Sequence, residues 1–406
     1  MKLDYRSINT FLCCLFFIAL LVTPKSYIWG PIGLVLLSLL SIKTAWRNIK
    51  VPEIKIICLS LVPYFILVVI SFFLYGGNTS QLDMPSRTLL ASLVLLHLYQ
   101  FPPKKLFVFY SIPIGGIITG MLALFHVLEL SPRAFMVNDY MVIQAAGMCA
   151  TLGVLSLVTY FYAKITNKKV LYVLSIVGAT SALLACLLTG ARGAWVLTPV
   201  VILTLIWNQR FLISKTSGVV SIIVAAICLI FASPQITARL SDVASDAAMY
   251  TEGKTVTSTG IRIELWKSSI YSFLDKPLFG QGFDGTMEAK KKQFSEGKVT
   301  EAALGSRRAH NQFFEDMQTK GSLGIIVLIS MFYFPYRVFK KIYKGSTTSI
   351  ESRYFALMGI CHIALVIGYS MTQHYLNHHS GIILYTMGTV ILASLCLPEK
   401  KTENDI

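Results

Sequence analysis

Long apolar runs recur along the 406-residue chain, and short polar connections separate most of them. A helix needs about 20 apolar residues to cross a hydrocarbon layer of roughly 30 Å. The pattern therefore predicts an all-α, polytopic membrane protein with about twelve transmembrane helices. The predicted spans are centred on residues 8–24, 28–42, 56–75, 86–101, 106–128, 138–163, 170–190, 193–208, 216–232, 321–339, 353–372 and 379–397.

One connection, between the ninth and tenth predicted spans, is long, polar and charged. It divides the chain into residues 1–232 with the first nine spans, a loop over residues 233–320, and residues 321–406 with the last three spans and a polar tail. The loop is the only substantial region predicted to lie outside the membrane. We therefore expect most of the chemistry to reside there.

Helical spacing of apolar residues within this loop predicts a helix over Ile261–Leu274 that lies on the membrane surface. Pro277–Gly285 is rich in turn residues. Glu288–Lys298 is typical of a solvated stretch, and Arg307–Gln318 is expected to lead helically into the tenth span.

Composition narrows the class of protein further. With 54% hydrophobic and 14% charged residues and a mean hydropathy of +0.64, a disordered chain is excluded and a soluble globular protein is disfavoured. The eight cysteines lie in or beside apolar runs without a CxxC pair, so neither a disulfide framework nor a zinc site is indicated.

The net charge of +16 would suggest a nucleic-acid partner in a soluble protein. Here the basic residues gather in alternate connections, as the positive-inside rule requires of a membrane protein. This places both termini in the cytoplasm and the long loop on the outer side. The expected surroundings are membrane lipids, with no nucleic acid, and the oligomeric state stays open.

Arg192 lies in the short connection Gly190–Trp195 between two apolar runs. An arginine close to hydrocarbon is costly unless it reaches the headgroups or meets an anion. Small neighbours, among them Gly193, would let a large anion approach the guanidinium and the backbone N–H groups. The alternative is an interfacial anchor for a tight hairpin.

Arg262, Trp266 and His310 are the candidates within the loop. Arg262 and Trp266 are four residues apart and share a helix face, although a cation beside an interfacial tryptophan is equally an anchoring pattern. His310 is the only histidine of the loop and precedes the tenth span. That position suits a general base at an interface, with a structural or solvated histidine as the alternative.

No metal and no cofactor is predicted. His374, His378 and His379 cluster in the last outer loop but have no cysteine and few carboxylates nearby. Gly280–Gly285 matches GxGxxG without the strand and helix that a dinucleotide site needs.

Four segments together resemble the O-antigen ligases of Gram-negative inner membranes. They are GARGAW at Gly190–Trp195, RIELW at Arg262–Trp266, PLFGQGF at Pro277–Phe283 and HNQFFEDMQTKGSLG at His310–Gly324. Each motif is short, but their order, with twelve spans and a long outer loop after the ninth, covers most of the chain. The same superfamily includes O-antigen polymerases and protein O-oligosaccharyltransferases.

The resemblance implies a glycosyltransferase of the bacterial cell inner membrane with a periplasmic active site. It implies transfer of O-antigen polysaccharide from undecaprenyl diphosphate to a sugar hydroxyl of the lipid A-core oligosaccharide, a step of lipopolysaccharide biosynthesis. Arg192, Arg262 and His310 match the functional residues of the family. The candidates for contacts with the diphosphate or the acceptor are Arg308, Asn311, Trp266 and Gly193.

The residue types suit this chemistry without a metal. Two planar guanidinium groups could bind the departing diphosphate, and an imidazole could take the proton of a hydroxyl that attacks the opposite face of the sugar, with inversion. A polymerase or a protein O-oligosaccharyltransferase is the nearest alternative. A polysaccharide flippase is disfavoured because no repeated halves are visible.

Overall fold

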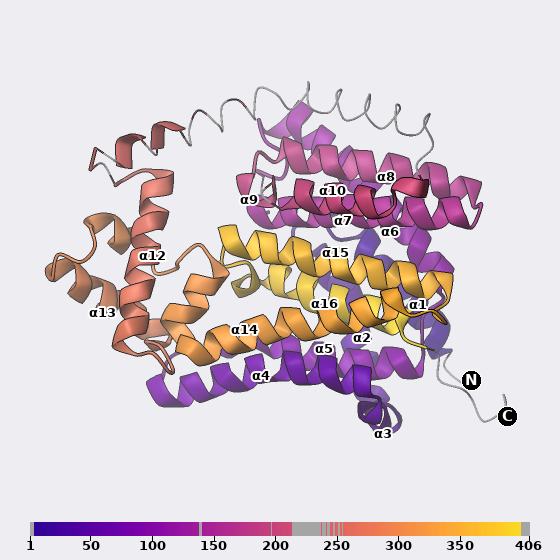
Figure 1. The fold of residues 1–406 in the computed structure, drawn as a ribbon, viewed down its shortest axis with the longest axis horizontal. Coiled ribbons are helices and arrows are strands. Elements are labelled where there is room, and N and C mark those ends of the chain that lie inside the picture. The colour runs from indigo at the N-terminus through magenta and orange to yellow at the C-terminus, as the bar shows by residue number, and fades with distance from the viewer. Residues whose placement is uncertain are drawn as a thin grey trace.

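The computed structural model describes residues 4–137, 140–195, 197–212 and 255–398, together with residues 237, 241, 244–246, 248–250, 252 and 253. The predicted ninth span, residues 216–232, lies outside this part of the chain. The described residues form helices and no strand (Figure 1). The α-helices are α1 (Tyr5–Ile18), α2 (Trp29–Leu40), α3 (Ile42–Ala45), α4 (Pro52–Tyr75), α5 (Asp83–Gln100), α6 (Lys105–Phe125), α7 (Val142–Ile165), α8 (Lys169–Leu188), α9 (Arg192–Trp195), α10 (Thr198–Asn208), α12 (Ser258–Asp275), α13 (Gly282–Ser295), α14 (Gln312–Lys344), α15 (Ile350–Thr372) and α16 (His379–Cys396).

Seven of these helices are long and apolar enough to cross a membrane: α4, α6 with its continuation to Leu130, α7, α8, α14, α15 and α16. The chain bends by 76° between Ser26–Leu40 and Ile42–Lys50, while α1 and the stretch Arg192–Asn208 are shorter apolar helices. The all-helical, polytopic architecture is thus confirmed for the described residues. The number of twelve spans stays a prediction.

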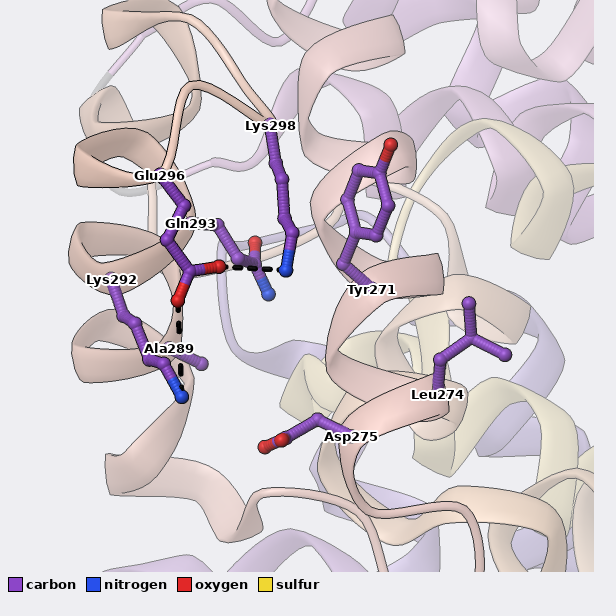
Figure 2. A pocket seen from close by; sticks show the side chains of 8 residues that line it. All are labelled: Tyr271, Leu274, Asp275, Ala289, Lys292, Gln293, Glu296 and Lys298. Carbon is purple, nitrogen blue, oxygen red and sulfur yellow. Dashed lines mark ion pairs between the residues drawn. The ribbon is translucent and has the colours of Figure 1, made fainter.

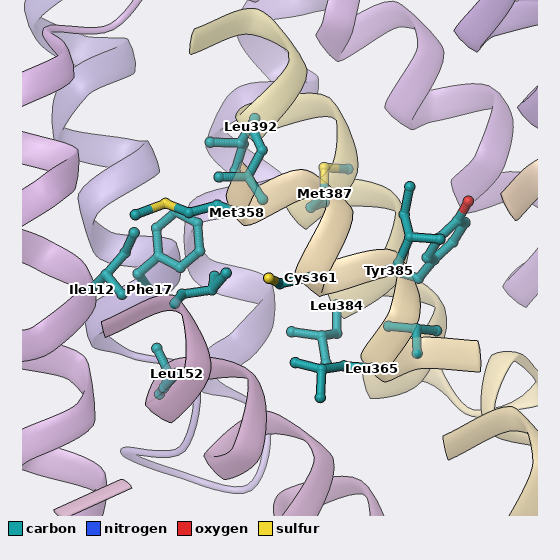
Figure 3. Packing of buried hydrophobic residues seen from close by; sticks show 14 of the residues in the cluster. Phe17, Ile112, Leu152, Met358, Cys361, Leu365, Leu384, Tyr385, Met387 and Leu392 are labelled. Carbon is teal, nitrogen blue, oxygen red and sulfur yellow. The ribbon is translucent and has the colours of Figure 1, made fainter. Parts of the chain in front are cut away.

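The helices of the bundle are held together by an apolar core to which α1, α6, α7, α15 and α16 all contribute (Figure 3). α16 lies deepest, since 94% of its apolar window is buried against 39% for α4. Phe109 stacks between Tyr162 and Phe355, with ring centroids 3.9 and 4.1 Å away. Exposed apolar side chains such as Phe73 and Leu203 face outward, as expected next to lipid.

Residues Ser258–Asn311, which we call the α12–α13 region, lie at one end of the bundle. α12 runs across the direction of the bundle helices and α13 lies beyond it, whereas the N and C labels are at the other end (Figure 1). The predicted helix Ile261–Leu274 is confirmed as α12, and it begins three residues earlier, at Ser258. Thr257 caps it, because its hydroxyl oxygen accepts from the N–H of Gly260 at 3.0 Å.

Two local predictions in this region were only partly correct. Most of the stretch interpreted as solvated, Glu288–Lys298, is exposed, but it includes the second half of α13, where Lys290 and Gln293 share a buried face with Thr286. The expected helix over Arg307–Gln318 begins only at Gln312, because the side chain of Asn311 caps it by accepting from two N–H groups of its first turn. Hydrophobicity alone missed α13, since its buried face is polar.

Gly321 kinks α14 at the boundary between the α12–α13 region and the bundle. Its φ of 63° is in the left-handed region, and a β-carbon there would lie 2.6 Å from the backbone of Leu278. The N–H of Ser322 donates to the carbonyl of Pro277 at 2.8 Å. The kink thus lets the α12–α13 connection pack directly against α14.

Candidate active site

The turn that carries Arg192 is built from small residues. Gly190 has a φ of 61°, and the guanidinium Nε of Arg133 donates to the carbonyl of Thr189 at 2.7 Å. Gly193 packs against the side chain of Thr372 at the end of α15. The missing side chain of Gly193 therefore makes room for α15, which differs from the expectation that it opens a path for an anion.

Arg262 projects from α12 and is half-buried. Burial lowers the pKa of its guanidinium, the positive charge of Arg192 lowers it further, and Asp246 acts in the opposite direction. Such charge effects act over a few ångströms. Arg192 and Arg262 are about 70 positions apart in the chain, and α9, which begins with Arg192, lies at the end of the bundle that faces α12 (Figure 1).

His310 sits immediately before the cap of α14 and is half-buried, with a φ of 50°. Burial lowers the pKa of the imidazole, and Arg262 and Lys290 lower it further, while Glu315 acts to raise it. His310 is therefore electrostatically coupled to Arg262, as Arg262 is to Arg192. That Arg192, Arg262 and His310 form one catalytic site stays a prediction.

Trp266 connects α12 to the His310 segment. Its indole N–H donates to the carbonyl of Ala309 at 3.0 Å, and its ring stacks on Phe314 with centroids 5.3 Å apart. Because Trp266 is one helical turn from Arg262, this contact fixes the face of α12 that Arg262 occupies. The face that Arg262 and Trp266 share therefore packs towards the segment that precedes His310.

Arg308 and Asn311 are both engaged with the protein. The Arg308 guanidinium forms an ion pair with Glu315 at 2.8 Å and lies over the ring of Phe283 at 4.3 Å. The amide nitrogen of Asn311 donates to the carbonyl of Met371 at 2.7 Å, which ties the His310 segment to the end of α15. These contacts hold the site together, and contacts of either residue with a substrate stay a prediction.

Sequence reasoning missed three residues around His310. Lys290 is completely buried and its pKa is lowered by burial to about 8. Glu315 is 1% exposed. His374 is 6% exposed, its ring centroid is 5.3 Å from that of His310, and burial lowers its pKa to about 3. No local pattern signalled that Lys290 is buried. Neither the motif that contains Glu315 nor the cluster that contains His374 showed that these residues lie beside His310.

The three clustered histidines, His374, His378 and His379, have different partners in the structure. The ring of His378 lies 4.7 Å from that of His374, whereas His379 is 3.7 Å from a carboxylate oxygen of Asp83. Within the described ranges, no group of three His, Cys, Asp or Glu side chains is arranged to hold a metal ion.

A pocket of about 320 Å³ lies between α12 and α13 (Figure 2). Two lysines of its lining, Lys292 and Lys298, contact Glu296. Its other lining residues are Tyr271, Leu274, Asp275, Ala289 and Gln293. The pocket's described lining includes none of the candidate residues.

Comparison with known proteins gives matches of two kinds. The sequence profile of a family described as "O-Antigen ligase" matches residues 177–329, a range that contains Arg192, Arg262 and His310. An uncharacterized protein of Haemophilus influenzae is 30% identical over 383 residues, which are 92% of this chain and 94% of the relative. An O-antigen ligase of Escherichia coli is 26% identical over 203 residues, about half of each chain (48% and 47%).

The matched range begins in α8 and ends in α14. It therefore spans the Arg192 turn, the α12–α13 region and the His310 segment, which are the parts that carry the three candidates for catalysis. The chain belongs to the O-antigen ligase superfamily, whose members are membrane glycosyltransferase-like enzymes that act on lipid-linked glycans.

Proposed function

We propose that this protein is an O-antigen ligase of the bacterial inner membrane. It transfers O-antigen polysaccharide from undecaprenyl diphosphate to a sugar hydroxyl of lipid A-core, on the periplasmic face. Both termini are then cytoplasmic, and the α12–α13 region is periplasmic.

The observation that carries this proposal is the convergence of the segments that bear Arg192, Arg262 and His310. Trp266 on α12 donates to the carbonyl of Ala309, while Asn311 and Gly193 both contact the end of α15, at Met371 and Thr372. Two half-buried guanidinium groups that lie near each other repel, and burial adds to the cost of the Arg262 charge. A multiply charged anion placed between them would remove that cost and gain planar, charge-assisted hydrogen bonds. A diphosphate at the membrane surface has the required charge.

The proposed reaction is a single displacement. The oxygen of the acceptor hydroxyl forms a bond to the anomeric carbon, while the bond from that carbon to the diphosphate oxygen breaks and its electron pair stays on the diphosphate. A ring nitrogen of His310 takes the hydroxyl proton. Arg192 and Arg262 stabilise the charge that grows on the leaving diphosphate.

The electrostatics of His310 suit a base. Because burial and the neighbouring cations lower its pKa, the imidazole is neutral at physiological pH and can accept a proton. Below that pKa the imidazole is protonated, so the rate is expected to fall with acidification. The midpoint of the acid limb of the pH–rate profile should therefore lie below the ordinary pKa of a histidine side chain.

The test is a reaction of the purified protein in detergent with undecaprenyl-diphosphate-linked O-antigen and lipid A-core. We expect conjugate and free undecaprenyl diphosphate in equal amounts, and both products to form far more slowly with His310→Ala. Product that grows on the lipid carrier without lipid A-core would identify a polymerase. No turnover with any hydroxyl acceptor would contradict the proposal.

A genetic assay separates the same alternatives. Deletion of the gene should leave polymer on its lipid carrier and core without polymer if the protein is a ligase. Loss of a polymerase would leave core that carries a single repeat unit.

A further inference from the structure

The segment Ser306–Ala309, which leads directly to His310, is held between two buried side chains of opposite charge. Glu315 projects from the first turn of α14 and Lys290 from the buried face of α13. The two are 1% and 0% exposed, respectively. Buried charges are costly unless they are paired or well hydrogen-bonded, so their placement calls for a physical reason.

Glu315 binds the donors of the segment. One carboxylate oxygen accepts from the guanidinium of Arg308 at 2.8 Å. The other accepts from the backbone N–H of Ala309 at 2.8 Å and from the amide of Gln318 at 2.9 Å. The residue before His310 is therefore fixed through its own backbone.

Lys290 binds the acceptors of the same segment. Its ammonium donates to the carbonyls of Ser306 at 2.7 Å and Arg307 at 3.0 Å. The negative charge of Glu315 acts on Lys290 across the segment and opposes the lowering of its pKa by burial. In this segment the carbonyls of Ser306 and Arg307 therefore accept from the Lys290 ammonium, and the N–H of Ala309 donates to the Glu315 carboxylate.

His310 itself needs such support. A φ of 50° is uncommon for a residue with a side chain and persists only where the surroundings determine it. The imidazole makes a long polar contact, 3.5 Å, between its Nε2 and the hydroxyl of Ser306, and its ring lies edge-on to that of His374. Its orientation therefore depends on the backbone that precedes it.

We propose that Glu315 and Lys290 are positioning residues that clamp residues 306–309 from opposite sides and hold His310 in its left-handed conformation. The proposal rests on the proposed function, because it assigns these two residues to the base of that reaction. Their contacts are with the backbone and Arg308, and each acts on the reaction through His310.

The charged and titratable groups that face His310 come from four elements. Arg262 on α12 and Lys290 on α13 lower its pKa, and Glu315 on α14 raises it. His374 and His378, between α15 and α16, have pKa values lowered to about 3 and 4 by burial, so they are neutral in the working range. Loss of the Glu315 charge should lower the pKa of His310, and loss of the Lys290 charge should raise it.

The experiment compares Glu315→Gln and Lys290→Met in the full-length protein in detergent. The matched control is Glu264→Gln, since Glu264 is also 1% exposed, pairs with a cation (Lys267) and accepts a backbone N–H, that of Thr300. The first readout is the titration of labelled histidine side chains by NMR, with His310→Gln assigning the His310 signal. The second is kcat and its pH profile in the transfer assay.

We expect the His310 titration to move to lower pH in Glu315→Gln and to higher pH in Lys290→Met, with no movement in Glu264→Gln. A displaced base should reduce kcat by roughly 10- to 100-fold in both variants, and the acid limbs should move in the same opposite directions. Movement in one common direction, or equal movement in the control, would overturn the proposal.

Two charge-preserving variants cover a failure of the first pair to fold. Glu315→Asp and Lys290→Arg keep each charge but move it, so the His310 titration should stay near that of the wild type while kcat falls. An unchanged kcat in both would overturn the clamp. If the titrations move as expected but the wild-type protein transfers no glycan, the proposed function fails and the clamp stands.

Discussion

The bundle and the α12–α13 region are stabilised by different interactions. In the bundle, apolar side chains such as Phe109 pack in a core to which several helices contribute. In the α12–α13 region many buried side chains make polar contacts: the hydroxyl of Ser268 donates to Gln293 at 2.6 Å, and the amide of Gln293 donates to Ser272 at 3.0 Å. Apolar packing is non-directional, whereas a hydrogen bond fails when either partner is lost.

This difference shows which region has to hold individual side chains in fixed orientations. The bundle has to hold its helices side by side, and many apolar side chains of suitable volume can do so. The α12–α13 region has to orient Arg262 and the segment before His310, and directed bonds from Trp266 and Glu315 do this. Substitutions in the second region should therefore affect catalysis even where the fold survives.

The largest expected effect is that of His310→Ala. Loss of the base should reduce kcat by about 10²- to 10⁴-fold, while binding of the lipid donor is retained because the guanidinium groups remain. Turnover and donor binding are measured on the same purified protein. Loss of donor binding would instead make His310 a phosphate ligand.

Arg192→Lys and Arg262→Lys should each reduce the rate by about 10²- to 10³-fold although the charge is kept. An ammonium lacks the planar pair of donors that a phosphate group accepts. The measurement is kcat/KM in the transfer assay, with Arg337→Lys, at an exposed position on α14 where Arg337 contacts Tyr333, as the matched control. Rates near that of the wild type for both site variants would contradict a bidentate role.

A smaller effect is expected on stability, where one substitution in each region compares the cost in unfolding free energy directly. Ser272→Ala leaves the buried amide of Gln293 without its acceptor and should cost about 1–3 kcal/mol of unfolding free energy. Leu365→Met in the bundle core keeps the volume and should cost less than about 1.5 kcal/mol. Thermal unfolding in detergent gives both values. Equal costs would remove the distinction between the regions.

Removal of divalent cations should have the smallest effect. Two guanidinium groups can neutralise a diphosphate without a metal, so EDTA is expected to leave the initial rate unchanged. Strong inhibition that a divalent cation reverses would contradict this mechanism.

The sequence predicted what depends on local pattern. Apolar periodicity predicted the helical membrane bundle and α12, and the motif order identified Arg192, Arg262 and His310 as the site candidates. Lys290 was expected to be solvated, because its neighbours are polar and nothing nearby along the chain shows that residues 306 and 307 cover it. Gly193 was assigned to anion access, but its partner Thr372 is about 180 positions away.

The same limit applies to the support of His310. Glu315 belongs to a recognisable motif, but its contact with the backbone of Ala309 requires the cap at Asn311 that ends the preceding non-helical segment. His374 reaches His310 only through the packing of α14 against α15 and the loop that follows. Partners supplied by distant segments cannot be obtained from local pattern.

The most direct measurement is photo-crosslinking with a prenyl diphosphate probe that carries a photoreactive group next to the diphosphate, followed by peptide mapping. We predict labelling of the peptides around Arg192, Arg262 and His310, and its suppression by undecaprenyl diphosphate. Labelling confined to the opposite end of the bundle, or labelling that undecaprenyl diphosphate does not compete, would contradict a lipid diphosphate site formed by these residues.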